Sequence, residues 1–157
     1  MTGFTSTMAG KLIITFLVSM VPVIELRGAI PIGVAMGLNP WVAFIVSAIG
    51  NMVPVPFIIL FVRKIFLWMR KFEKFRRLVD WFEAKGEKAG EKLVKYEMFG
   101  LFLLVAIPLP GTGAWTGSLV AALFDLQLKR SVPIIFAGVL AAGLIVLFVT
   151  YGVVLLV

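Results

Sequence analysis

The sequence predicts an all-α integral membrane protein with a single domain over residues 1–157. Hydrophobic residues make up 61% of the chain and charged residues only 15%, whereas soluble domains average roughly 45–50% apolar and 25% charged residues. Two uncharged stretches, 41–60 and 131–157, also reach the roughly 20 residues that a helix needs to cross a bilayer. The shorter apolar stretches between them must be explained one by one.

The first apolar stretch, 11–24, has only about 14 residues and is too short to cross a bilayer alone. It leads into Glu25–Gly37 (ELRGAIPIGVAMG), which places a carboxylate and a guanidinium two residues apart and contains three glycines and a proline. Ile30–Leu38 is again short and apolar, and Asn39-Pro40 is typical of a turn. Two short arms around a polar, irregular tip predict a re-entrant hairpin. The alternative is one long kinked helix over 11–38 that contains a buried ion pair.

The next stretch, 41–62, predicts a full membrane span. Trp41 suits one interface, and the basic residues that start at Arg63 mark the other. Asn51, Pro54 and Pro56 interrupt the span. Because proline removes a helical hydrogen bond, we expect this helix to be kinked.

Segment 63–97 contains eleven of the fifteen basic residues of the chain. Its aromatic and aliphatic residues recur at helical spacing (Phe72, Phe75, Val79 and Phe82), which predicts a basic amphipathic helix on the membrane surface. The positive-inside rule places this connector in the cytoplasm, against anionic lipids. Membrane lipid explains the net charge of +7 better than nucleic acid does, and we expect no nucleic-acid partner.

The second half repeats this order. A short apolar arm, 98–107, is followed by a tip rich in glycine and proline at 108–117 (PLPGTGAWTG) and an arm that ends at Phe124. Asp125, Lys129 and Arg130 form a polar break before the last span. The predicted organisation is repeat 1 at about 11–62, connector 63–97 and repeat 2 at about 98–157.

A shift of 80 residues places Gly33 on Gly113 and Gly37 on Gly117, which supports an internal repeat. With the connector in the cytoplasm, the first hairpin enters from outside and the second from inside. The predicted fold is therefore an inverted repeat of a re-entrant hairpin plus a transmembrane helix. Transporters use such repeats to bring two helix breaks together near the midplane. The single charge of Lys11, which falls outside, disagrees with this orientation.

Glu25 and Arg27 are the strongest functional candidates, because ionisable residues within a membrane are usually functional. Glu25 suits a carboxylate that takes up and releases a proton, and Arg27 offers a fork of donors to an anionic group. The structural alternative is an ion pair between the two. Asn51 within the first span is a further candidate polar contact. The other candidates are residues of the two tips that have an unusual backbone, a hydroxyl group or an aromatic ring: Pro31, Pro108, Pro110, Gly111, Thr112, Gly113, Trp115 and Thr116.

The sequence lacks the residues that several classes of protein function require. The chain has no cysteine and no histidine, so the usual zinc ligands and thiol nucleophiles are missing. It also has no Gly-rich phosphate loop on a strand–helix unit and no catalytic triad. We therefore expect no metal, no cofactor and no enzymatic activity.

The motifs Glu25-Leu-Arg-Gly-Ala-Ile-Pro31 and Pro108–Gly117 resemble the signature of the small multidrug export protein family, over essentially the whole chain. That family is related more distantly to the DedA superfamily, in which paired re-entrant hairpins, proton-dependent transport and the return of polyprenyl-phosphate across the membrane are described. The resemblance implies Glu25 and Arg27 at one tip, facing Pro110, Gly111 and Gly113 at the other. DedA second tips carry arginines, whereas this one has no basic residue between Lys95 and Lys129.

The predicted function is a proton-coupled secondary transporter of the cytoplasmic (inner) membrane, which it crosses several times. Its substrate would be an amphipathic or anionic small molecule or a lipid. One alternative is a polyprenyl-phosphate or lipid translocase of the DedA type. Another is a membrane scaffold without transport activity that docks partners through 63–97. A second copy of the chain would cover the hairpin tips as a homodimer.

Overall fold

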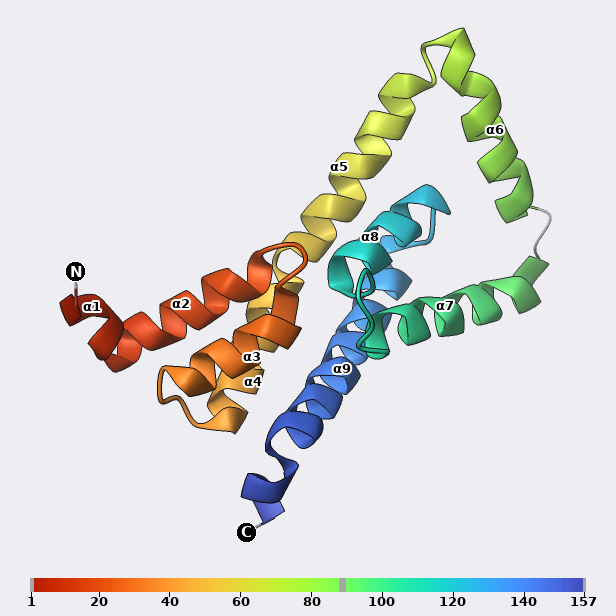
Figure 1. The fold of residues 1–157 in the computed structure, drawn as a ribbon. Coiled ribbons are helices and arrows are strands. Elements are labelled where there is room, and N and C mark those ends of the chain that lie inside the picture. The colour runs from red at the N-terminus through yellow and green to blue at the C-terminus, as the bar shows by residue number, and fades with distance from the viewer. Residues whose placement is uncertain (1, 88–89, 157) are drawn as a thin grey trace.

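The structure is a computed structural model that describes residues 2–87 and 90–156. Within these residues all regular secondary structure is helical and there is no strand, which confirms the all-α class (Figure 1). The helices are α1 (Thr2–Ser6), α2 (Met8–Met20), α3 (Glu25–Ala35), α4 (Pro40–Met52), α5 (Pro54–Met69), α6 (Glu73–Glu87), α7 (Gly90–Ala106), α8 (Ala114–Leu123) and α9 (Leu128–Leu156).

Helices α2 and α3 pack against each other as a hairpin, so residues 11–38 do not form the single kinked helix of the alternative prediction. The turn lies at 21–24, earlier than predicted, and φ is +78° at Val23 and +47° at Glu25. The predicted irregular tip at 25–37 is instead mostly the helix α3, with Pro31 inside it. Burial of Leu26 and Ile30 in the core stabilises this helix and outweighs the hydrogen bond that Pro31 removes.

Helices α3 and α8 end in the same way. Gly37 follows α3 with φ +88°, and Asp125 follows α8 with φ +49°. In each case the next residue is a buried leucine, Leu38 or Leu126, whose N–H donates to the carbonyl five residues earlier, at 3.0 and 2.9 Å. A long apolar segment then begins three residues after the turn residue, with α4 in one half and α9 in the other.

These equivalent positions are 88 residues apart, and a further pair of glycines has the same spacing. A Cβ added to Gly50 of α4 would lie 2.6 Å from the carbonyl oxygen of Phe16 in α2. A Cβ added to Gly138 of α9 would lie 3.1 Å from the carbonyl oxygen of Phe102 in α7. In both halves, glycine therefore lets the long helix approach the backbone of the preceding short arm.

The predicted shift of 80 residues is wrong, because it pairs glycines with different tasks. Gly33 lies inside α3 against Thr15, whereas Gly113 immediately precedes α8 with φ +136°. Gly37 ends α3, whereas Gly117 lies inside α8 against Val105. Glycine is used for too many purposes in membrane helices for two matching glycines to set a register.

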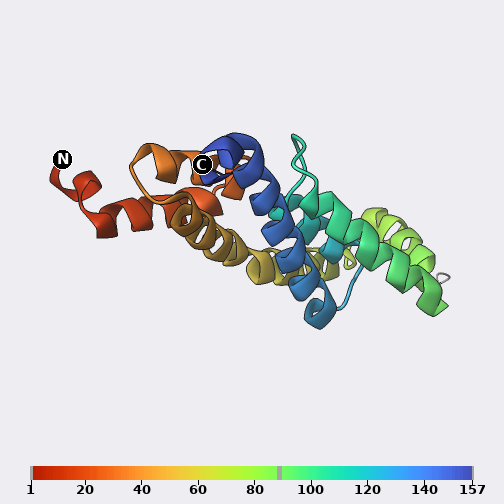
Figure 2. The ribbon, with the colours of Figure 1, turned by 90° about the horizontal axis from the view of Figure 1, so that it is seen from below.

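The second hairpin consists of α7 and α8, which are joined by an irregular segment at 107–113. As predicted, this segment breaks the helix, although the last four residues of the predicted tip already belong to α8. Helix α7 packs against α9, and α8 lies against both α5 and α9. Figure 2 shows an elongated molecule with α1 and α2 at one end, α6 at the other and α9 between them.

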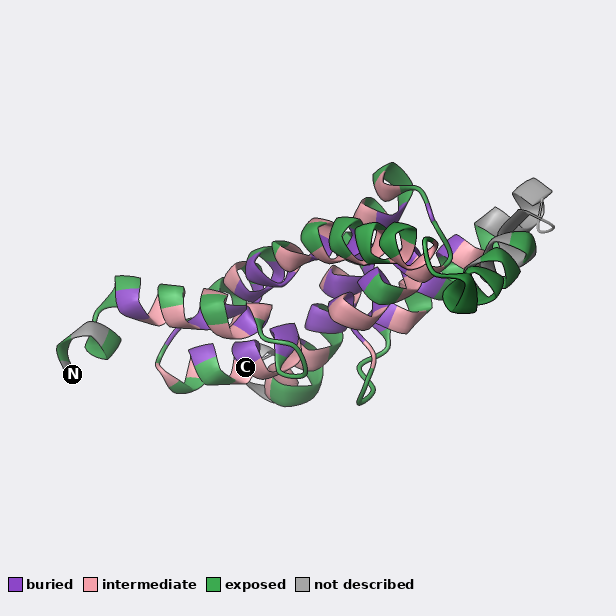
Figure 3. Ribbon diagram, turned by 90° about the horizontal axis from the view of Figure 1, so that it is seen from above, coloured by how far each residue is buried: buried purple, intermediate pink, exposed green. Residues whose placement is uncertain are grey.

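Two segments are long and apolar enough to cross a membrane, by length and composition. They are Pro40–Met69, formed by α4 and α5, and Leu128–Gly152 of α9. The chain bends between α4 and α5 at Val53, where Pro54 begins the next helix, as the prolines predicted. Figure 3 shows exposed residues on helices throughout the molecule. Large apolar side chains on both segments are exposed, as contact with lipid requires: Ile45, Ile49, Phe57, Phe61, Phe136 and Phe148.

The predicted connector helix over 63–97 is divided among three helices. Its beginning belongs to α5 and its end to α7, while α6 occupies the middle and residues 88–89 lie outside the described part. Helix α6 contacts α5, lies apart from the other helices and runs back from the end of α5 toward the start of α7 (Figure 1). Three large apolar side chains of α6 are exposed, as is Phe72 just before it: Phe75, Leu78 and Trp81. The side chains of Val79 and Phe82, two of the residues in the predicted apolar pattern, lie outside the described part.

Candidate functional site at the junction of the two hairpins

The carboxylate of Glu25 binds the start of α8, which belongs to the other hairpin. Its side chain is only 5% exposed, and its two oxygens accept the N–H groups of Ala114 (3.3 Å) and Trp115 (3.0 Å). These are the first two residues of α8, whose N–H groups have no partner within their own helix. A negative charge is also favourable at the positive end of the helix dipole. Glu25 therefore caps α8 from a distance of 89 residues along the chain.

Gly113 makes room for this contact. It precedes α8 with φ +136° and ψ −166°, a conformation that essentially only glycine adopts. A Cβ added to it would overlap the carboxylate of Glu25. Gly113 supplies no side chain to cap α8, and the carboxylate of Glu25 occupies that position.

The guanidinium of Arg27 binds acceptors of the irregular segment after α7. It donates to the carbonyl oxygens of Leu109 and Ile107 (3.1 Å for Ile107) and to the hydroxyl of Thr112 (2.9 Å). The Thr112 hydroxyl in turn lies 2.8 Å from the carbonyl oxygens of both Ile107 and Leu109. The carboxylate thus binds N–H groups at a helix start, and the guanidinium binds carbonyl groups beyond a helix end. Both contacts match the helix dipole.

The ion pair of the structural alternative does not form. Glu25 and Arg27 are both described, and their charged groups do not approach within 4 Å, whereas Arg63 and Asp125 form an ion pair at 3.4 Å. The physical reason is that the backbone groups of the second tip provide each charge with its own partners. We name this set of contacts the tip junction: Glu25 and Arg27 with segment 107–115.

Trp115 adds a third link in the opposite direction. Its indole N–H donates to the carbonyl oxygen of Met20, the last residue of α2, at 3.1 Å. The Thr116 hydroxyl, by contrast, donates to the carbonyl of Gly111 at 2.9 Å and stabilises the second tip internally. Each hairpin therefore binds a helix end of the other.

The remaining predicted residues are arranged differently. Pro108, Pro110 and Gly111 lie on the exposed side of the second tip, where Gly111 has φ +80°. Pro31 lies inside α3, six residues after Glu25, and forms none of the hydrogen bonds described for the tip junction. The structure thus brings together Glu25, Arg27, Thr112, Gly113 and Trp115, and it leaves Pro31 apart.

Asn51 of α4 lies beside the same junction. It is only 2% exposed and lines a narrow void together with Glu25 and Gly113, too small for a water molecule. Its Oδ1 has no hydrogen-bond partner in the described part of the chain. An unpaired buried acceptor costs about 1–3 kcal/mol, so Asn51 is a polar group that this arrangement of the tips does not satisfy.

The groups that the sequence could not reveal are backbone groups. The carbonyls of Met20, Ile107 and Leu109 and the N–H of Ala114 take part in the junction. Every residue has such groups, and only the ends of the helices leave them free. The one signal in the sequence was the density of proline and glycine around 108–113.

The family model described as "Putative small multi-drug export protein" matches residues 25–145, well over half of the chain. The chain belongs to the small multidrug export protein family. The match begins at Glu25 and includes both tips, which confirms the family resemblance expected from these motifs. No match was found among curated proteins or among solved structures. Membership in this export family and the two long apolar segments together indicate a membrane protein, as predicted.

Proposed function

We propose that this member of the small multidrug export protein family is a proton-coupled secondary transporter of the cytoplasmic membrane. The observation that supports it most directly is the buried Glu25 carboxylate, which holds the start of α8 from the opposite hairpin. A single titratable group thus connects two parts of the molecule that must separate if access to the junction is to alternate. The family description, which names export, favours a transporter over an enzyme.

In the proposed arrangement, both hairpins are re-entrant and the two halves form an inverted repeat. The common spacing of 88 residues supports the repeat, since it relates the ends of α3 and α8, the starts of α4 and α9, and Gly50 to Gly138. The basic connector 63–97 lies in the cytoplasm against anionic lipid. The tip junction then lies near the midplane, as in other transporters with broken helices.

Protonation of Glu25 would weaken the junction. The charged carboxylate accepts two N–H groups and interacts favourably with the helix dipole, and both contributions decrease when the carboxyl group becomes neutral. The start of α8 would then be released, and the second tip could move. Asn51, whose Oδ1 lacks a partner beside Glu25, offers an acceptor to the protonated carboxyl group.

Movement of the second tip would free Arg27, because its three acceptors all lie on that tip. A free guanidinium binds carboxylate or phosphate through a fork of donors. The proposed substrate is therefore an amphipathic or anionic small molecule, or a lipid with an anionic head group. Transport of polyprenyl-phosphate by a DedA-type mechanism is the variant of this proposal in which the lipid is the substrate.

The alternative is a membrane scaffold that docks partners through 63–97. It is favoured by one observation, the exposed apolar side chains of α6 and of Phe72, which a partner protein or the membrane surface would cover. The homodimer also stays a prediction.

The membrane arrangement is tested by labelling, because the chain has no native cysteine. Ala9→Cys and Lys74→Cys are both at exposed positions, one in α2 and one in α6. In intact cells, an impermeant maleimide is expected to label position 9 from outside, and position 74 only after the membrane is permeabilised. Labelling of both positions from the same side would contradict the re-entrant first hairpin.

Transport is tested in liposomes that carry a pH gradient. Wild-type protein is expected to accelerate flux of at least one compound from a set of drugs, amphipathic anions and polyprenyl-phosphate. Glu25→Gln should reduce this flux at least about tenfold, since general acid–base groups and buried charges contribute on this scale. Asp80→Asn on α6 removes the same charge away from the junction and should leave the flux unchanged.

The scaffold alternative predicts a different result. In liposomes, the flux with wild-type protein and with Glu25→Gln would then equal the flux of empty vesicles for every compound. In cells, charge reversals in 63–95 would abolish the function of the protein, whereas Glu25→Gln would preserve it.

A further inference from the structure

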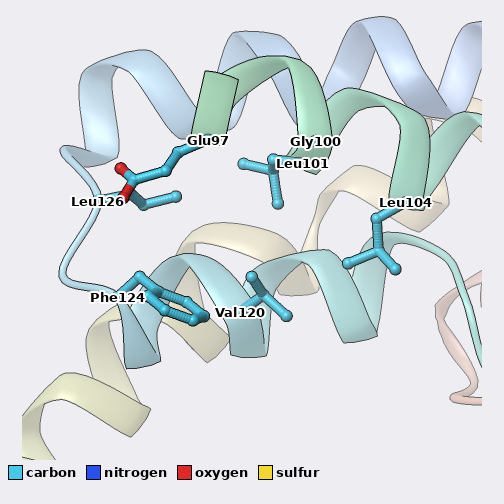
Figure 4. A pocket seen from close by; sticks show the side chains of 7 residues that line it. All are labelled: Glu97, Gly100, Leu101, Leu104, Val120, Phe124 and Leu126. Carbon is cyan, nitrogen blue, oxygen red and sulfur yellow. The ribbon is translucent and has the colours of Figure 1, made fainter. Parts of the chain in front are cut away.

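A cavity of about 200 Å³ lies between the two arms of the second hairpin, at the end away from the tip junction. Its walls are largely apolar and come from both arms, with Leu101 and Leu104 of α7 facing Val120 of α8 and Phe124 just after α8 (Figure 4). A closed apolar cavity of about 150 Å³ holds one benzene molecule; the present cavity has a comparable volume but is open on one side, where Gly100 and Phe124 of its wall are exposed. The cavity therefore accommodates one aromatic ring or an apolar group of similar size.

Glu97 of α7 is the charged residue among the side chains that line the cavity. It lies at the same end as Phe124 (Figure 4) and is only partly exposed. Within the described part of the chain, Glu97 forms no ion pair and no hydrogen bond. A carboxylate beside an aromatic ring is a recurring way to bind an ammonium group, because both attract a cation.

A guanidinium that reaches this end of the cavity is already engaged. Arg63 of α5 pairs with Asp125 at 3.4 Å and donates to the carbonyl of Leu126, which also lines the cavity. Arg63 therefore does not serve as an ion-pair partner of Glu97. A cationic ligand would give Glu97 such a partner, whereas the acyl chain of a lipid would fill only the apolar part of the cavity.

We propose that this cavity binds an organic monocation that carries one aromatic ring or an apolar group of similar size. The apolar group lies between α7 and α8, and the ammonium group lies next to Glu97 and Phe124. This site goes beyond the proposed function, because binding here requires neither proton coupling nor opening of the tip junction.

The probe is benzyltrimethylammonium, whose binding is measured by equilibrium dialysis against the full chain in phosphatidylcholine nanodiscs, with empty nanodiscs as the blank. Wild-type protein is expected to bind it saturably, with one site per chain. Glu97→Gln should weaken binding about threefold to fivefold, since it removes the charge of a partly exposed partner and keeps the shape. Asp80→Asn removes a charge on α6 and should bind as wild type does. Val120→Phe fills the cavity and should abolish binding.

Three results would overturn the proposal: no saturable binding to wild type, equal binding to Glu97→Gln, or equally effective competition by benzyl alcohol or benzenesulfonate. If Val120→Phe fails to fold, Glu97→Gln still decides, because its side chain is isosteric and only partly buried.

Discussion

Gly113→Ala is expected to disrupt the tip junction more than any other single methyl group added to the chain. The new Cβ would overlap the carboxylate of Glu25, and the backbone conformation at 113 is one that essentially only glycine adopts. We expect the free energy of unfolding to fall by about 2–4 kcal/mol, the range of large single-residue effects. Unfolding of the purified protein by titration of a denaturing detergent measures this change.

The control is Gly100→Ala in α7. A Cβ at this position meets no atom within 4 Å, and alanine favours a helix by up to about 1 kcal/mol over glycine, so stability should stay constant or rise. A second comparison isolates the contact itself. Because Gly113 and Glu25 touch, the double variant Gly113→Ala with Glu25→Ala should lose less stability than the sum of the two single variants. Strict additivity would mean that the side chain of Glu25 does not occupy the position described.

Arg27→Lys is expected to impair the protein although it preserves the charge. The guanidinium reaches three acceptors on the second tip at once, and an ammonium group cannot reproduce this planar fork. Hydrogen bonds that involve a charged group contribute about 1.5–3 kcal/mol, so we expect a loss of this order in the free energy of unfolding. The proton-driven flux should fall with it if Arg27 also binds the substrate.

Arg76→Lys provides the matched control, since Arg76 is exposed on α6 and far along the chain from both tips. Its unfolding and flux should equal those of wild type. If Arg27→Lys behaved in the same way as Arg76→Lys, the fork of contacts to the second tip would have no energetic importance, and a simple positive charge at position 27 would suffice.

The tip junction also explains why the first tip is strained. Val23 is a β-branched residue with φ +78°, and Glu25 itself has φ +47°. Such conformations cost about 1–3 kcal/mol each and persist only where surrounding contacts hold them. Here the turn at 21–24 must reverse the chain and at the same time direct Glu25 and Arg27 toward the second tip. The hydrogen bonds of Glu25 and Arg27 to the second tip offset the energetic cost of these two backbone conformations.

Much of the fold follows from the sequence through the periodicity and length of its apolar segments. The kink before Pro54, the turn at Asn39-Pro40 and the break after α7 were all predicted from proline, glycine and asparagine residues. The structure adds that Asn39 caps α4, since its side chain accepts the N–H of Trp41 at 2.9 Å. Helix α3 was not predicted, because Pro31 and three glycines predict irregular backbone when burial of their neighbours is unknown. This segment is helical because the helix buries Leu26 and Ile30 in the core.

The sequence by itself determined the all-helical class, the two long apolar segments and the presence of two charges, Glu25 and Arg27, among apolar residues, because hydrophobicity and charge belong to the side chains. Only the tertiary structure decided which groups those charges bind. Glu25 and Arg27 bind the backbone of the second tip rather than each other, and the similar ends of α3 and α8 lie 88 residues apart rather than 80. Free backbone N–H and carbonyl groups exist only where helices end, so their partners appear only once the helices have been packed.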